Sequence, residues 1–286
     1  MMVLKHKNTS FKQWDNEKEG IQLAKSISFS DYAIVACGTM IPELNYLHET
    51  GFLDVQAIYT APGLHQVPEE LEIQLQKQIE IAKKSAKKII VVYGGKYCYI
   101  NMRDPYRTVD TVIEEMREPG YYLARTEVEN CLDMLATKDE REALAEGQNV
   151  WFCTPGWLKY RDMVFKGWDK ANANENFPQY TGGGIMLDPI GFFDDYAMEH
   201  VEEILDFSDW ASIPLEARTV GLERFKDVLI SAMEEEDRLW DREDCVMKEV
   251  IMFTAQNCSS CKNAKNFLFQ NKIQFEQKDI NVDHGS

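Results

Sequence analysis

The sequence lacks any apolar run that approaches the ~20 residues needed to cross a membrane. The opening residues Met1 to Lys7 also lack the apolar core of a secretory signal peptide. We therefore expect a cytoplasmic protein without a membrane partner. Because the cytosol is reducing, the seven cysteines favour thiol chemistry, metal binding or burial over structural disulfides.

Basic residues are scarce: 31 Lys and Arg stand against 48 Asp and Glu, which gives a net charge of −17. A chain this acidic repels phosphates, so no nucleic-acid partner is expected. The loops that bind nucleotides are missing too. Cys37-Gly-Thr-Met follows the first strand pattern where a Gly-x-Gly-x-x-Gly loop would stand, and Gly182-Gly-Gly184 precedes a strand pattern instead of a helix. No nucleotide cofactor is therefore expected.

The chain has 286 residues and 44% hydrophobic residues, enough for one large or two ordinary domains. Its first part alternates apolar runs with helical patterns. Strands are expected at 31–37, 54–59 and 88–93, with helices at 42–49 and from 68 to about 83 between them. This order predicts an α/β fold with a mostly parallel sheet and flanking helices.

The remaining pattern extends this fold and then changes. We expect further helices at 11–26, 105–118, 157–168, 195–205 and 219–240, and further strands at 121–124, 149–153 and 185–188. A highly charged stretch at 234–244 precedes a change in composition, which predicts a boundary near residue 246. The expected domains are 1–245 and 246–286.

Cysteines follow three of the apolar runs, at Cys37, Cys98 and Cys153. The carboxyl ends of parallel strands lie at one edge of a sheet, where open α/β folds hold their ligands. Three thiols could therefore converge there. The alternative is that each is a packing residue, because free cysteine is among the most buried residue types.

Several short motifs share an order and a spacing. They are Ala36-Cys-Gly-Thr-Met-Ile-Pro-Glu43, Pro62-Gly-Leu-His-Gln-Val-Pro-Glu-Glu-Leu71, Tyr93-Gly-Gly-Lys-Tyr-Cys98, Cys131-Leu-Asp-Met-Leu135 and Thr154-Pro-Gly-Trp-Leu158. Over roughly residues 30–230 they resemble an uncharacterised domain-of-unknown-function family of anaerobes, whose members often accompany corrinoid-dependent methylamine methyltransferases. The resemblance implies functional positions at Cys37, His65, Cys98 and Cys131, and a corrinoid protein or a methyltransferase as a candidate partner.

Three thiolates and one imidazole suit zinc or another soft transition metal. We therefore expect a metal at Cys37, His65, Cys98 and Cys131, with Cys153 as a substitute ligand. For His65 the alternative is an ordinary loop histidine that is hydrogen-bonded and binds no metal, which is the more common case. The leading hypothesis is a zinc-like metal-binding protein of one-carbon or corrinoid-linked metabolism, enzymatic or accessory. A non-catalytic accessory protein with buried cysteines is an alternative.

The carboxyl-terminal motif Cys258-Ser-Ser-Cys261 stands between an apolar run and a helical pattern. A helix amino terminus lowers the pKa of the first thiol in such a motif, and the second thiol resolves the mixed disulfide. Residues 249–283 resemble the first half of a glutaredoxin, which implies a partial thioredoxin-like β-α-β segment with Cys258 as nucleophile and Cys261 as resolving thiol. A thiol–disulfide oxidoreductase is thus a second alternative.

Other polar and aromatic residues near the expected sheet edge have simpler interpretations. We expect ordinary surface positions, with acid–base or anion-binding roles as the alternative, for Glu43, Arg103, Asp104, Arg125 and Asp188. Core and rim packing is expected for Trp151, Trp157 and Trp168.

Overall fold

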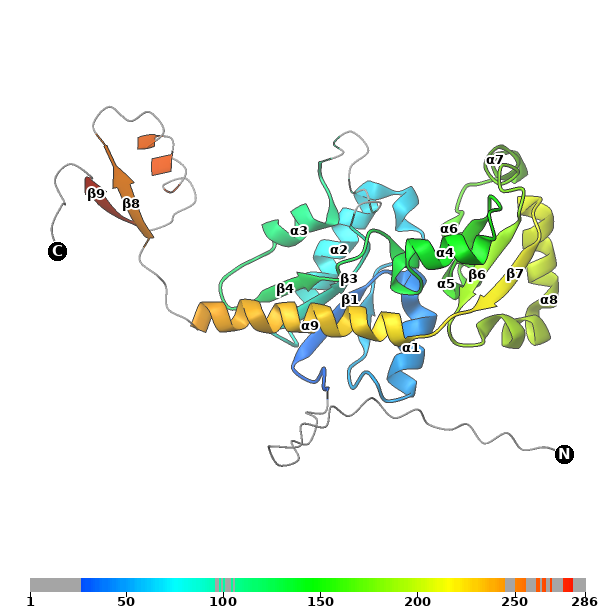
Figure 1. Ribbon diagram of the computed structural model, residues 1–286, viewed down its shortest axis with the longest axis horizontal. Helices are drawn as coiled ribbons and strands as arrows, with labels where there is room; N and C mark the ends of the chain where they lie inside the picture. Colours follow the sequence, from blue (N-terminus) through cyan, green and yellow to red (C-terminus); the bar gives the residue numbers. More distant parts are fainter. Residues whose placement is uncertain are drawn as a thin grey trace.

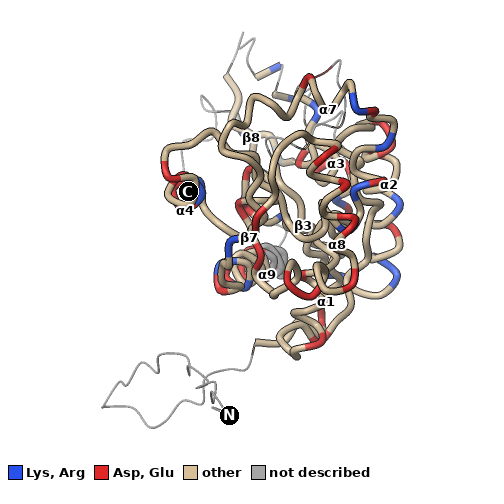
Figure 2. Tube along the Cα trace, turned by 90° about the vertical axis from the view of Figure 1, so that its right-hand side faces the viewer, with Lys and Arg blue, Asp and Glu red and all other residues tan. Residues whose placement is uncertain are grey.

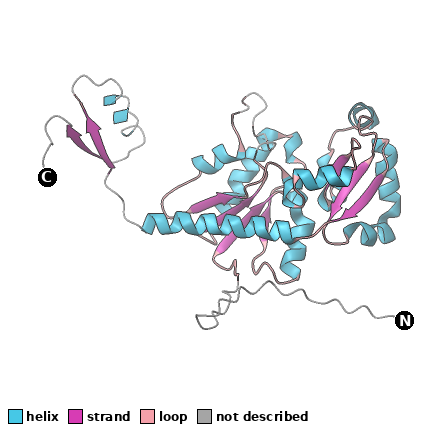
Figure 3. Ribbon diagram, in the orientation of Figure 1, coloured by secondary structure: helices cyan, strands magenta, loops and turns pink. Residues whose placement is uncertain are grey.

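The computed structural model describes residues 27–95, 98, 100, 104, 106–244, 250–255, 261, 262, 264, 265, 268 and 275–279. Within these residues it contains two parallel sheets flanked by helices, and a separate pair of parallel strands (Figures 1 and 3). The α/β class with parallel strands is confirmed. The helix expected at 11–26 lies outside the described residues.

The first sheet has the strand order β2-β1-β3-β4, and all its pairs are parallel. Its strands are β1 (Tyr32–Ala36), β2 (Ala57–Tyr59), β3 (Lys88–Val92) and β4 (Tyr122–Arg125). The chain moves from β1 to β2 on one side and then to β3 on the other. The loops after β1 and β3 therefore diverge and leave a crevice at this switch point, where ligands bind in such sheets.

Side chains of the first sheet alternate between two apolar layers. Ile34 and Ala36 of β1 pack with α1 (Ile41–Glu49) and α9 (Glu223–Asp244). Ala33 and Val35 pack on the opposite face, which is covered by two other helices, α2 (Pro68–Ala82) and α3 (Val109–Glu115). The sheet is thus buried on both faces, which explains why its strands are continuous apolar runs.

The second sheet has the order β5-β6-β7, with β5 (Trp151–Cys153), β6 (Gly184–Asp188) and β7 (Leu215–Thr219). The helices beside these strands are α4 (Lys138–Ala145), α5 (Pro155–Lys159), α6 (Arg161–Val164), α7 (Lys170–Asn176) and α8 (Phe192–Ala211). None of the helices in the described part of the chain combines the length and apolarity that a membrane crossing requires.

The second sheet corrects two expectations. The single helix predicted at 157–168 is two short helices, α5 and α6, joined at Tyr160. Strand β7 was not predicted at all, because it lies at the sheet edge and its residues are half-buried or exposed, so its apolar pattern is weak. The strands of residues 27–244 therefore form two sheets instead of one.

Helix α9 connects the second sheet back to the first. It begins after β7 and runs along the first sheet (Figure 1), where Phe225 and Leu229 join the β1–β3 core. Near its end, Asp237 Oδ1 accepts hydrogen bonds from Tyr32 Oη at 2.5 Å and Lys88 Nζ at 2.6 Å. Beyond Asp244, the parallel pair β8 (Val250–Thr254) and β9 (Phe275–Asp279) places Val250 opposite Phe275.

Candidate functional site

A cavity of about 190 Å³ lies at the carboxyl-terminal edge of the first sheet. Cys37, His65, Cys98 and Cys131 all line it, and they follow β1, β2, β3 and β4 respectively. Trp157 of α5 lines it from the second sheet. The structure therefore brings the four predicted ligand positions together at the switch point of the sheet.

Cys37 is held by the loop that follows β1. Its backbone N–H donates to the carbonyl of Val92 at 3.2 Å, and its Sγ lies 3.1 Å from the hydroxyl of Thr39. A Cβ at Gly38 would lie 2.4 Å from the carbonyl oxygen of Thr60. Glycine is therefore required there, because the loops after β1 and β2 approach each other closely.

Arg125 fixes the loop that leads from β3 to Cys98. Its Nη1 donates to three carbonyl oxygens, at 3.1 Å from Tyr93, 2.5 Å from Thr126 and 3.1 Å from Val128. Its Nε donates to Asp110 at 2.6 Å. With 15% of its side chain exposed, Arg125 joins the loops after β3 and β4 and is not the ordinary surface residue expected from the sequence.

Cys131 is the first residue of a 3₁₀ turn, and its neighbours Asn130 and Asp133 cap the start of this turn through reciprocal hydrogen bonds. Asn130 Oδ1 accepts from the backbone N–H groups of Leu132 and Asp133, and Asp133 Oδ2 accepts in return from the N–H of Asn130 at 3.1 Å. Asp133 also binds Arg141 at 2.6 Å. This reciprocal capping fixes the backbone that presents the Cys131 thiol.

His65 carries the clearest sign of a missing interaction. Its Nε2 is buried and has no hydrogen-bond partner among the described residues, and its ring stacks on that of Trp157. Burial lowers the pKa of His65, so the imidazole is neutral and keeps a lone pair. Buried polar atoms without partners are uncommon and call for an explanation such as a bound ion.

The thiols of this cavity are protonated near neutral pH. Burial raises the pKa of Cys37, raises that of Cys98 to about 12 and raises that of Cys131 further still. Repulsion from Cys37 adds to the effect at both other thiols. Among the described basic side chains, only Arg125 opposes this increase, by lowering the pKa of Cys98.

The donor types fit a soft metal ion, since three thiols and a neutral imidazole form a zinc-type ligand set. Among the described residues, however, no three or more His, Cys, Asp or Glu side chains already stand in a metal-binding group. The residues thus converge on one cavity without forming a closed coordination shell. Metal binding would require these side chains to move closer together.

Cys153 does not join the cavity. It ends β5 in the second sheet, is 1% exposed and packs in the core of that sheet. Burial raises its pKa strongly. The expected convergence of strand-end thiols therefore holds for Cys37 and Cys98 and is wrong for Cys153, because β5 belongs to a different sheet.

A buried carboxyl group near the cavity was not expected. Glu43 in the first turn of α1 is fully buried, and neither of its carboxyl oxygens has a hydrogen-bond partner in the described part of the chain. Burial raises its pKa to about 8, and the nearby carboxylate of Asp188 adds to this. The signal in the sequence is spacing: Glu43 lies three residues after Met40 and four before Leu47, both in the core.

Asp188 is also buried, contrary to the surface position expected for it. Its carboxylate accepts from the backbone N–H groups of Ile190, Phe192 and Phe193 at 2.8 to 3.1 Å. It therefore stabilises the start of α8, where a negative charge complements the helix dipole.

The carboxyl-terminal Cys261 is not among the residues that line this cavity. Cys258 lies outside the described residues, and Cys261 is disulfide-bonded. The parallel pairing of β8 with β9 agrees with a β-α-β segment. The glutaredoxin-like interpretation stays a prediction.

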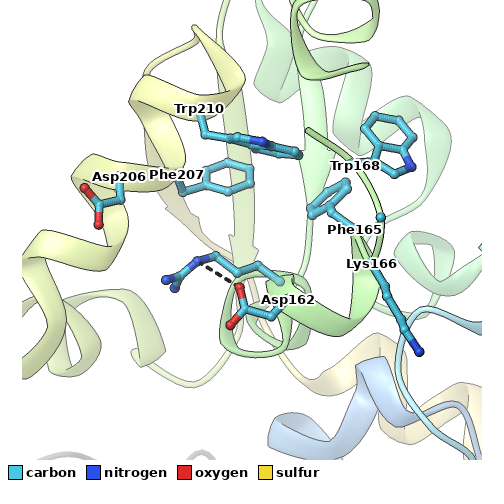
Figure 4. Close-up of a pocket in the computed structure, with 9 residues that line it drawn as sticks. Asp162, Phe165, Lys166, Trp168, Asp206, Phe207 and Trp210 are labelled. Carbon is cyan, nitrogen blue, oxygen red and sulfur yellow. Dashed lines mark ion pairs between the residues drawn. The ribbon is translucent and has the colours of Figure 1, made fainter. Parts of the chain in front are cut away.

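A second cavity, of about 370 Å³, lies between α8 and the segment that follows α6 (Figure 4). The rings of Phe165, Trp168, Phe207 and Trp210 gather on one side of it, and the ring centroids of Trp168 and Trp210 are 6.4 Å apart. It shares no lining residue with the cysteine cavity. This cavity has an aromatic wall suited to a flat apolar group and no metal-binding thiol or imidazole.

The fold and the cavity define an α/β protein with a thiol- and imidazole-lined cavity at a topological switch point. The chain belongs to the family described as "Protein of unknown function (DUF1638)", whose model matches residues 59–229. This match confirms the uncharacterised-family part of the resemblance. No curated protein and no solved structure shows significant similarity to the chain.

Proposed function

We propose that this protein binds zinc or another soft transition metal through Cys37, His65, Cys98 and Cys131. The observation that carries the proposal is that His65, whose buried Nε2 has no partner among the described residues, lines the same small cavity as three cysteines. Thiol and imidazole groups are the donors that zinc prefers.

The surroundings of the cavity support the same proposal. No Lys, Arg, Asp or Glu is among its lining residues in the described part of the chain. No basic side chain of the lining therefore pairs with a thiolate in place of a metal ion. Capping at Asn130 and the hydrogen bonds of Arg125 hold the loops from outside. Such outer contacts orient metal ligands. A bound zinc would supply Lewis-acid activation of a thiol or a water.

We further propose a corrinoid protein or a methyltransferase as the partner, in one-carbon metabolism. Its support is the resemblance carried by the motifs around Cys37, Cys98 and Cys131. The site itself adds one consistent property, since soft thiolate ligation suits chemistry at sulfur and metal centres.

Elemental analysis of anaerobically purified protein tests the metal. We expect about one metal ion per chain. Cys37→Ser should lose it, because Cys37 lines the cavity. Cys153→Ser is the control: it removes a buried thiol that does not line the cavity and should keep the metal. Absence of metal in the unmodified protein, or equal loss in both variants, would contradict the proposal and leave the cysteines as packing residues of an accessory protein.

The disulfide at Cys261 supports a second candidate, a thiol–disulfide oxidoreductase that acts through Cys258 and Cys261. This function requires a low pKa at the Cys258 thiol. Alkylation of Cys258 as a function of pH measures that pKa directly. A value near that of an ordinary free cysteine would remove this candidate.

A further inference from the structure

From its surface, we propose that α8 is a docking site for a basic amphipathic helix of another protein. The helix presents an apolar stripe and an acidic stripe side by side, and both are exposed. This inference is independent of the metal proposal, because none of the residues involved lines the cysteine cavity.

The apolar stripe consists of Met198, Val201 and Leu205, which are 77%, 52% and 62% exposed. The backbone of α8 leaves helical values at His200 (φ −132°, ψ 35°), so the helix is kinked there. After the kink, Val201 and Leu205 lie four residues apart on one side of the helix, and Met198 lies in the part before it. The buried face of α8 is formed by different residues, Ile204, Phe207 and Ala211. The apolar stripe therefore does not contribute to the core. Contiguous exposed apolar side chains of this kind mark interaction sites.

Each residue of the apolar stripe is followed directly by an acidic one: Glu199, Glu202 and Asp206. Asp209 extends this row beyond the kink, whereas Asp195 and Glu199 lie before it. Consecutive residues are about 100° apart around a helix, so after the kink the acidic row adjoins Val201 and Leu205.

The charge on α8 has one sign. Its twenty residues include seven Asp and Glu and no Lys or Arg (Figure 2). Within the described residues, Glu203 pairs with Arg161 and Asp209 pairs with Lys170, whereas Glu202 and Asp206 have no ion pair with a basic side chain.

This charge selects the occupant. A second copy would oppose one acidic helix to another, and an anionic membrane or a nucleic acid would be repelled in the same way. A helix that carries Lys or Arg beside an apolar stripe complements both rows at once, as in helix-in-groove recognition.

A fluorescently labelled helical peptide tests the docking site on the full chain. The probe carries leucine at i, i+3 and i+7 and lysine at each following position. Its control carries glutamate in place of lysine. Fluorescence anisotropy should show saturable binding of the lysine peptide only. The double variants V201S/L205S and E202Q/D206N should each weaken it by about tenfold or more.

Ile73→Ser is the matched control, since Ile73 is 64% exposed on α2 of the first sheet. It should leave the affinity unchanged. An equal loss in Ile73→Ser, no binding of the lysine peptide, or equal binding of the glutamate peptide would overturn the proposal. So would sedimentation of the chain as a dimer that V201S/L205S dissociates, because the occupant would then be a second copy. Circular dichroism checks that each variant keeps its fold.

Discussion

The imidazole of His65 stacks on the indole of Trp157, with ring centroids 5.0 Å apart and an interplanar angle of 22°. His65 follows a strand of the first sheet, whereas Trp157 belongs to a helix that follows a strand of the second. The candidate site therefore depends on both sheets, and the orientation of its only imidazole is set by a residue from outside the first sheet.

Replacing Trp157 by Ala should weaken zinc binding by about tenfold or more, because the His65 ring loses the surface that orients it. Trp157→Phe keeps a stacking ring and should cost less. Competition with a chromophoric chelator measures the affinities. Trp168→Ala is the control, since Trp168 lines the separate aromatic cavity. A similar loss there would indicate a general effect of removing an aromatic residue.

Metal uptake should release protons. Burial raises the pKa of all three cavity thiols, so near neutral pH each holds a proton that a metal must displace. We expect about three protons released per zinc ion. The pKa of His65 is lowered, so it adds none at neutral pH.

The apparent zinc affinity should consequently rise between about pH 6 and pH 8, as the cost of deprotonating the thiols falls. A pH indicator in weakly buffered solution measures the protons during zinc titration. Uptake of zinc without proton release would show that the ligands are not these thiols.

Glu43→Gln should change how stability depends on pH. The pKa of Glu43 is about 8 in the folded protein and ordinary in the unfolded chain, so the folded state binds the extra proton between about pH 4.5 and pH 8. Over this window the wild type loses stability relative to the variant as pH rises, by up to about 1.4 kcal/mol per pH unit. Below it the two differ least.

Urea unfolding of the wild type and Glu43→Gln at pH 5, 6, 7 and 8 measures this difference. Glu80→Gln serves as control, because the Glu80 side chain is 58% exposed. A constant difference between wild type and Glu43→Gln across the series would show that Glu43 is not protonated in the folded protein.

Arg125→Gln should destabilise the protein by about 2–4 kcal/mol, because three carbonyl oxygens lose their donor where the loops after β3 and β4 meet. Asp110→Asn removes only the exposed end of the same interaction, since Asp110 is 56% exposed, and should cost less than about 1 kcal/mol. Thermal unfolding compares the two. If Asp110→Asn costs as much as Arg125→Gln, the ion pair and not the carbonyl contacts holds the loops.

Local pattern was sufficient to predict the first sheet. The apolar runs of β1 and β3 are buried on both faces, and the helices between them begin at Pro-containing turns. The apolar pattern and the prolines therefore indicate the same boundaries between strands and helices. The same information could not separate the second sheet from the first, because strand pairing is a long-range property. The apolar pattern before Cys153 therefore predicted a strand and could not show that this strand belongs to a second sheet.

The site was predictable in its donors and not in its surroundings. Cys37 and Cys98 followed from strand ends, and Cys131 and His65 came from the family resemblance. The contribution of Trp157 was missed, because a tryptophan after a strand fits a core position equally well. Glu43 was assigned to the surface because carboxyl groups are rarely buried without a partner, and here one is.

The contacts of Asp237 with Tyr32 and Lys88 span 205 and 149 residues of sequence. Helix α9 also supplies apolar side chains to the face of the first sheet that it shares with α1. During synthesis on the ribosome, the part of that face which α9 covers therefore stays exposed until the α9 residues have emerged. At about 5–20 residues per second, this delay lasts on the order of ten seconds or more after β3 emerges. During this period a chaperone could bind the exposed apolar face of the first sheet on the nascent chain.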